Sequence, residues 1–145
     1  MQARWGMEGR DHRCCILVVE DEPDLRDVLS VALGADGYQV SAASDGRTAL
    51  RHLRSTPATC LIVLDLMLPV MNGHRFRDLQ VRDRSLAWIP VVVVSGALDA
   101  AREARELGAS AFVRKPVDVD ELRAVVTRVD CVHRRGHPEQ RQTMV

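Results

Sequence analysis

Five short apolar runs alternate with segments of helical periodicity along the chain. Three of them, Cys14–Val19, Cys60–Leu64 and Ile89–Val94, consist of apolar residues throughout, which is typical of parallel strands covered on both faces. Tyr38–Ala42 alternates apolar with polar positions and Ala111–Val113 is short, so we expect these two at the edges of a sheet.

Each apolar run is followed by a segment in which apolar residues recur every three or four positions, as on one face of a helix. Pro23 and Gly37 delimit the first of these helices, Gly108 ends the fourth, and Asp118 caps the fifth. The predicted helices lie around 23–36, 48–54, 74–82, 100–107 and 119–129. This alternation predicts an α/β fold: a doubly wound, flavodoxin-like, five-stranded parallel sheet in the order 2-1-3-4-5, with helices on both faces.

The composition of the 145 residues is that of an ordinary globular domain, with 46% hydrophobic residues, 28% charged residues and a formal net charge of zero. We assign residues 14–130 to one domain and expect a disordered N-terminal arm at 1–13 and a polar, disordered tail at 131–145. A neutral chain without a recognition-helix motif gives no reason to expect nucleic-acid binding. No apolar stretch reaches the length of a membrane span and the N-terminus lacks a signal-peptide core, so we expect a cytoplasmic protein with no membrane partner.

Polar residues stand where the apolar runs end. Lys115 is the only lysine among the 20 Lys and Arg residues, and because the chain otherwise uses arginine for positive charge, a compact ammonium group is indicated there. Glu20 and Asp21 follow the first run, Asp65 the third and Ser95 the fourth. In a doubly wound sheet these ends meet at one edge, where ligands bind between the first and third strands.

Three carboxylates, from Glu20, Asp21 and Asp65, would repel one another at that edge unless a cation joins them. Mg²⁺ fits, because it takes oxygen ligands from one or two carboxylates together with waters and phosphate oxygens. A carboxylate beside Mg²⁺ can attack phosphorus to form an aspartyl phosphate, and the transferring group needs donors such as Ser95 and Lys115. The residues therefore predict magnesium-dependent phosphoryl chemistry at this edge.

Four short motifs occur in a fixed order along the chain. They are Val-Val-Glu-Asp-Glu-Pro, Leu-Asp-Leu-Met-Leu-Pro-Val-Met-Asn-Gly, Val-Val-Ser-Gly and Phe-Val-Arg-Lys-Pro. Each motif is a weak signal alone, but the four in this order are specific. Over about Cys14–Val129 the chain resembles the response regulator receiver domain of two-component signalling. The resemblance implies that Asp65 accepts a phosphoryl group from the phosphohistidine of a sensor histidine kinase or a histidine phosphotransfer protein, and that a downstream protein target responds.

The resemblance further implies how the site is built. The implied magnesium ligands are the carboxylates of Glu20, Asp21 and Asp65 and the backbone carbonyl of Met67. The peptide bond between Lys115 and Pro116 is implied to be cis, an isomer that is tolerated only before proline. The family more often has aspartate at the position of Glu20, a difference of one methylene group.

A two-residue switch is implied as well. Ser95 and its loop would move inward towards the phosphoryl group, and the vacated space would let Phe112 swing from an exposed to a buried position. The family often has tyrosine where this chain has Phe112. The change would be reported to the protein partner at a face formed by roughly 102–113 and 120–128.

Two other functions compete with this interpretation. A receiver-like module that binds partners without phosphorylation would have the same fold, but it would not need the complete set of acids with Ser95 and Lys115. A haloacid-dehalogenase-like phosphatase also uses a strand-end aspartate and Mg²⁺, but it requires a second aspartate where this chain has Met67. A stand-alone receiver and a segment of a longer regulator or hybrid kinase both fit the sequence.

Overall fold

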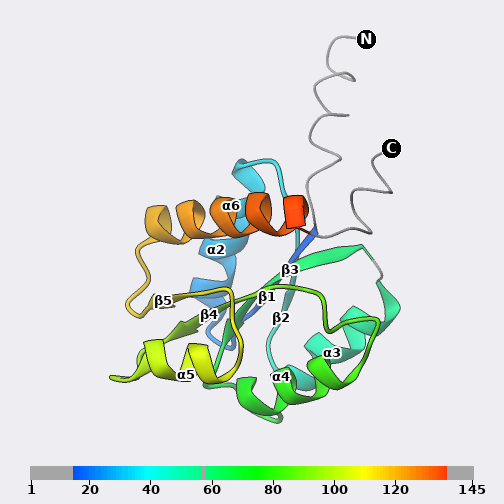
Figure 1. Cartoon of the computed structure of the whole chain (residues 1–145). Helices are drawn as coiled ribbons and strands as arrows, with labels where there is room; N and C mark the ends of the chain where they lie inside the picture. The colour runs from blue at the N-terminus through cyan, green and yellow to red at the C-terminus, as the bar shows by residue number, and fades with distance from the viewer. Residues whose placement is uncertain (1–14, 57, 137–145) are drawn as a thin grey trace, which may run out of the picture.

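The structure is a computed structural model that describes residues 15–56 and 58–136. Its centre is one parallel sheet in the order β2-β1-β3-β4-β5, which confirms the predicted topology (Figure 1). The strands are β1 (Cys15–Val19), β2 (Gln39–Ala43), β3 (Thr59–Asp65), β4 (Val91–Ser95) and β5 (Ala111–Arg114). The apolar strands β1, β3 and β4 are central and β2 and β5 form the edges. The central strands are buried on both faces except at the half-buried Cys15 and Cys60, whereas each edge strand has exposed residues.

Helices cover both faces of the sheet. They are α2 (Pro23–Ala35), α3 (Gly46–Ser55), α4 (Gly73–Arg82), α5 (Ala100–Glu106) and α6 (Val119–Gly136). Helices α2 and α6 pack on one face, and α3, α4 and α5 pack on the other (Figure 1). Since side chains alternate along a strand, β1 contributes Ile16 and Val18 to the first core and Leu17 and Val19 to the second.

Strand β4 differs slightly from the sequence-based prediction. It begins at Val91, two residues after the predicted start at Ile89. The backbone N–H of Ile89 donates to the carbonyl of Leu86 at 3.1 Å, so Ile89 belongs to a turn. Pro90 has no N–H to offer the sheet, although its carbonyl accepts the N–H of Ile62 at 3.0 Å.

Helix α6 continues to Gly136, so the predicted start of a disordered tail at residue 131 is wrong for residues 131–136. No glycine or proline interrupts the chain between Pro116 and Gly136, and the polar composition of the last turns does not prevent helix formation. The expectations for residues 1–13 and 137–145 lie outside the described residues.

Helix α4 is attached to the turn after α5 by buried polar side chains. Arg77 donates to two carbonyls of that turn, at 2.9 and 3.1 Å, and to the side-chain oxygen of Gln80 at 2.8 Å. The side-chain amide of Gln80 is fully buried and donates to the carbonyls of Leu86 and Ile89, at 2.9 and 3.1 Å. Because every one of these contacts is a hydrogen bond, the cost of burying the polar groups is offset.

The carboxyl ends of the strands lie along one edge of the sheet. Asp65 and Ser95 are the last residues of β3 and β4, Glu20 directly follows β1, and Lys115 directly follows β5. Between β1 and β3 the direction of the strand order reverses, which is where doubly wound sheets bind ligands. Within the described residues, no helix combines the length and the hydropathy needed to cross a bilayer.

Candidate functional site

Three carboxylates converge at the reversal point of the sheet. Oxygen atoms of Glu20, Asp21 and Asp65, one from each residue, all lie within 4.8 Å of one another. Glu20 and Asp65 are buried, with 1% and 2% of their surface exposed, whereas Asp21 is exposed. The arrangement offers a partly enclosed set of oxygen ligands with one side open to solvent.

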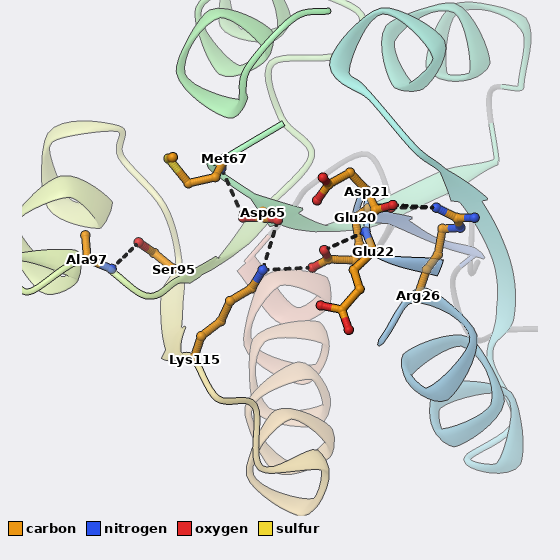
Figure 2. Close-up of polar contacts among 9 residues, drawn as sticks. All are labelled: Glu20, Asp21, Glu22, Arg26, Asp65, Met67, Ser95, Ala97 and Lys115. Carbon is orange, nitrogen blue, oxygen red and sulfur yellow. Dashed lines mark hydrogen bonds and ion pairs between the residues drawn. The ribbon is translucent and has the colours of Figure 1, made fainter. Parts of the chain in front are cut away.

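Each buried carboxylate binds the backbone with one oxygen and the single lysine with the other (Figure 2). Asp65 Oδ1 accepts the backbone N–H of Met67 at 3.0 Å, and Asp65 Oδ2 lies 3.0 Å from Lys115 Nζ. Glu20 Oε2 accepts the backbone N–H of Glu22 at 3.1 Å, and Glu20 Oε1 lies 3.3 Å from the same Nζ. One ammonium group therefore bridges the two buried carboxylates.

The positive charge of Lys115 does not balance the cluster. Burial away from water, together with the charge of Asp65, raises the pKa of Glu20 to about 7, even though the N–H of Glu22 and the ammonium of Lys115 oppose the shift. Burial alone would lower the pKa of Lys115, but its hydrogen bond and its charge interaction with Asp65, assisted by Glu20, raise that pKa instead. Three carboxylates against one ammonium leave an excess of negative charge.

These properties fit a hard divalent cation. The donor set consists of carboxylate oxygens only, and burial, with a smaller contribution from Asp65, raises the pKa of Glu20, an energetic cost that a bound cation would offset. The backbone carbonyl of Met67 is the further ligand expected from the sequence. The N–H of Met67 donates to Asp65 (Figure 2), so the backbone enters Met67 beside the cluster. Met67 itself is 79% exposed.

Ser95 and Phe112 flank this cluster. Ser95 is buried, and its Oγ accepts the backbone N–H of Ala97 at 3.1 Å, so within the described residues its hydroxyl oxygen is held by its own loop (Figure 2). Phe112 is 36% exposed, on the edge strand β5. The peptide bond between Lys115 and Pro116 is cis. The structure thus brings Glu20 and Asp65 into contact with Lys115. The backbone carbonyl of Ser95 accepts the N–H of Lys115 at 2.9 Å, but within the described residues its hydroxyl oxygen bonds to Ala97 and not to the acids.

Arg26 is a neighbour of the site that the sequence-based interpretation missed. Its Nη1 donates to the backbone carbonyl of Glu20 at 2.9 Å and lies 3.4 Å from that of Asp21 (Figure 2). A signal was available, because Arg26 occupies the first turn of α2, where the helix dipole disfavours a positive charge.

Comparisons with known proteins converge on one family. A family model for the response regulator receiver domain matches residues 16–127. Sporulation initiation phosphotransferase F of Bacillus subtilis is 32% identical over 114 residues, which make up 78% of this chain and 90% of that protein. Alkaline phosphatase synthesis transcriptional regulatory protein SphR of Synechococcus elongatus is 37% identical over an alignment of 139 positions, which covers 88% of this chain and 52% of that protein.

Among solved structures, the chemotaxis response regulator CheY4 of Vibrio cholerae matches with a TM-score of 0.75 and 26% identity. The match covers 81% of this chain and 98% of that one. Several curated relatives are much longer, so the chain spans about half or less of their length.

Proposed function

Since the chain belongs to the response regulator receiver domain family, we propose that it is a phosphorylation-activated receiver whose acceptor is Asp65. The observation that carries the proposal is that Lys115 Nζ binds one oxygen of Asp65 and one of Glu20 inside a cluster of three carboxylates. A structural ion pair would need one acid, whereas transfer of a phosphoryl group needs an acceptor carboxylate, cation ligands and a fixed donor.

The proposed step transfers a phosphoryl group from the phosphohistidine of a sensor histidine kinase or a histidine phosphotransfer protein. An oxygen of Asp65 forms a bond to phosphorus while the bond from phosphorus to the histidine nitrogen breaks, and the electron pair of that bond remains on the imidazole. Lys115, already 3.0 Å from Asp65 Oδ2, would donate to an oxygen of the phosphoryl group. Ser95 would donate to another after leaving its contact with Ala97.

Glu20, Asp21, Asp65 and the carbonyl of Met67 are the residues that would hold Mg²⁺. When bound, the cation supplies positive charge that neutralises the phosphoryl oxygens as they approach the acids. The three carboxylates of the cluster support this assignment, because without a cation they would repel the negatively charged phosphoryl donor.

The output would be a conformational change read by a downstream protein in the cytoplasm. If Ser95 turns from Ala97 towards the phosphoryl group, the β4–α5 loop follows it and space opens beside β5. Phe112, 36% exposed, would then turn inward. The chain would catalyse only its own phosphorylation and dephosphorylation, acting as a signalling module and not as an enzyme on other substrates.

The proposal is tested by incubating the protein with acetyl phosphate, with Mg²⁺ or with a chelator, and measuring intact mass. We expect uptake of one phosphoryl group with Mg²⁺ and none with the chelator, because the acids otherwise repel the donor. Peptide mapping after trapping should locate the group on Asp65. Equal uptake in the presence of the chelator would contradict the magnesium-dependent reaction, and no uptake at all would favour a receiver-like binding module that works without phosphorylation.

Met67 is expected to prolong the life of the phosphorylated state. It lies two residues after Asp65, and its exposed thioether side chain can neither orient nor activate a water molecule. Met67→Asn and Met67→Glu should each shorten the lifetime of the aspartyl phosphate severalfold, as followed by intact mass after removal of the donor. Met67→Leu is the matched control and should leave it unchanged. An unchanged or longer lifetime in both polar variants would contradict the prediction.

Lys115→Arg is expected to preserve magnesium binding but to impair switching. The charge remains, but the planar guanidinium is bulkier than the ammonium that fits between Glu20 and Asp65 at 3.3 and 3.0 Å. The measurement is the phosphorylation-induced NMR shift of Phe112, which should be largely lost in the variant. If the arginine variant moved Phe112 as fully as the parent, Lys115 would supply only generic positive charge.

A further inference from the structure

The turn that carries Glu20 and Asp21 is held by several hydrogen bonds. It comprises residues 20–22, between β1 and α2. The N–H of Glu20 donates to the carbonyl of Ala43 at 3.0 Å, which attaches the start of the turn to the end of β2. The N–H of Glu22 donates to the Glu20 carboxylate at 3.1 Å, which closes the turn on itself.

Asp21, in the middle of this turn, is held differently. Its carboxylate is exposed, and within the described residues no hydrogen bond or ion pair fixes that carboxylate. The direction in which it points therefore depends on the backbone at residues 20 and 21. The side chain that holds this backbone is Arg26, whose Nη1 is shared between the carbonyls of Glu20 and Asp21, at 2.9 and 3.4 Å.

We propose that Arg26 is a positioning residue for the magnesium site, which by holding these two carbonyls fixes the turn in the conformation that directs Glu20 and Asp21 towards Asp65. Figure 2 shows the geometry: the guanidinium lies on the side of the turn away from Asp65, and the two carboxylates lie between them. Arg26 thus acts through the backbone and does not touch the bound ion. This inference rests on the proposed function, because it takes the acids as magnesium ligands.

The position of Arg26 costs helix stability. A cation in the first turn of α2 faces the positive end of the helix dipole, an unfavourable interaction of about 0.3–1 kcal/mol. The other charged residue in that turn is Asp24, which has the favourable sign. A residue placed for helix stability alone would not be an arginine, so the contact with the turn is the physical reason for its place.

Two effects of removing Arg26 oppose each other. Loss of a positive charge near three carboxylates would by itself strengthen Mg²⁺ binding, but this charge is partly exposed and screened by water and salt. Loss of the hold on the turn would weaken Mg²⁺ binding, since partners that orient metal ligands are typically worth about 10- to 100-fold in affinity. The positioning effect is larger, so the sign of the change distinguishes the two roles.

The test is isothermal titration of the full chain with MgCl₂, with urea unfolding measured on the same samples. Arg26→Met should weaken Mg²⁺ binding, raising the dissociation constant at least about tenfold. Arg26→Lys keeps a donor but not the reach of the guanidinium, and it should restore part of the affinity.

Arg123→Met is the matched control. Arg123 binds both carboxylate oxygens of Asp36, at 2.7 and 3.0 Å, at the opposite end of α2, so its loss should lower stability and leave Mg²⁺ affinity unchanged. Equal weakening in Arg26→Met and Arg123→Met would show a global effect and overturn the inference. If the folded Arg26→Met variant bound Mg²⁺ as tightly as the parent or more tightly, the inference would be overturned as well. Failure of the parent chain to bind Mg²⁺ would instead overturn the proposed function itself.

Discussion

Asp65→Asn is expected to reduce phosphoryl uptake from acetyl phosphate to background while leaving the fold intact. An amide oxygen is a far weaker nucleophile than a carboxylate, so the bond to phosphorus does not form. The fold should survive, because the Asn Oδ1 still accepts the N–H of Met67, which Asp65 Oδ1 accepts at 3.0 Å. Lys115 loses one partner but keeps Glu20, 3.3 Å away.

The matched control is Asp45→Asn. Asp45 also follows a strand at the carboxyl edge of the sheet, but its side chain caps α3 by accepting the N–H of Thr48 at 2.8 Å, and asparagine caps a helix equally well. Intact mass with Mg²⁺ and acetyl phosphate should show normal uptake for Asp45→Asn and none for Asp65→Asn. Uptake of one phosphoryl group by the Asp65 variant would mean that another residue is the acceptor.

The topology and the place of the site were predictable because both depend on local patterns. The uninterrupted apolar runs of β1, β3 and β4 require cover on two faces, which puts these strands in the centre. Once the order is fixed, residues at the carboxyl ends of the strands must share one edge, and there Lys115 contacts both Glu20 and Asp65. No knowledge of side-chain packing is needed for that step.

What the sequence did not reveal depends on tertiary contacts. Arg77 and Gln80 are polar residues on an amphipathic helix, and pattern alone assigns them to solvent, whereas the structure buries both by offering them carbonyls from distant turns. The role of Arg26 likewise depends on how a side chain folds back over a turn. The inward movement expected of Ser95 remains a prediction, because its hydroxyl oxygen is held by Ala97 in this conformation.

The site also depends on a glycine that the sequence marks only as the end of a loop. Gly73 begins α4, and its N–H donates to the carbonyl of Leu66 at 3.0 Å, so the helix starts directly against the end of β3. A Cβ added at Gly73 would lie 2.7 Å from the carbonyl oxygen of Asp65 and 2.7 Å from the Cα of Leu66. Both are backbone atoms, and real Cβ atoms essentially never come so close.

Gly73→Ala is therefore expected to destabilise the protein by about 3 kcal/mol and to slow phosphoryl uptake. The backbone at Asp65 cannot easily yield, because Asp65 is paired with Val94 in the sheet and the N–H of Leu66 donates to Val94 at 3.4 Å. Moving α4 instead would pull the fully buried Phe76 out of its core. Either response displaces the acceptor carboxylate from Lys115 or opens the core beneath it.

Urea unfolding of Gly73→Ala and Gly34→Ala separates this close approach from the general effect of replacing glycine. Gly34 lies in α2, where an added Cβ meets no atom within 4 Å, so alanine there should stabilise the protein by about 0.5–1 kcal/mol through lower backbone entropy of the unfolded chain. The two substitutions are chemically identical, so opposite signs can come only from their surroundings. If the unfolding free energy of Gly73→Ala lay within about 0.5 kcal/mol of the parent value, which is the range usual for surface substitutions, α4 would have room to move without disturbing Asp65.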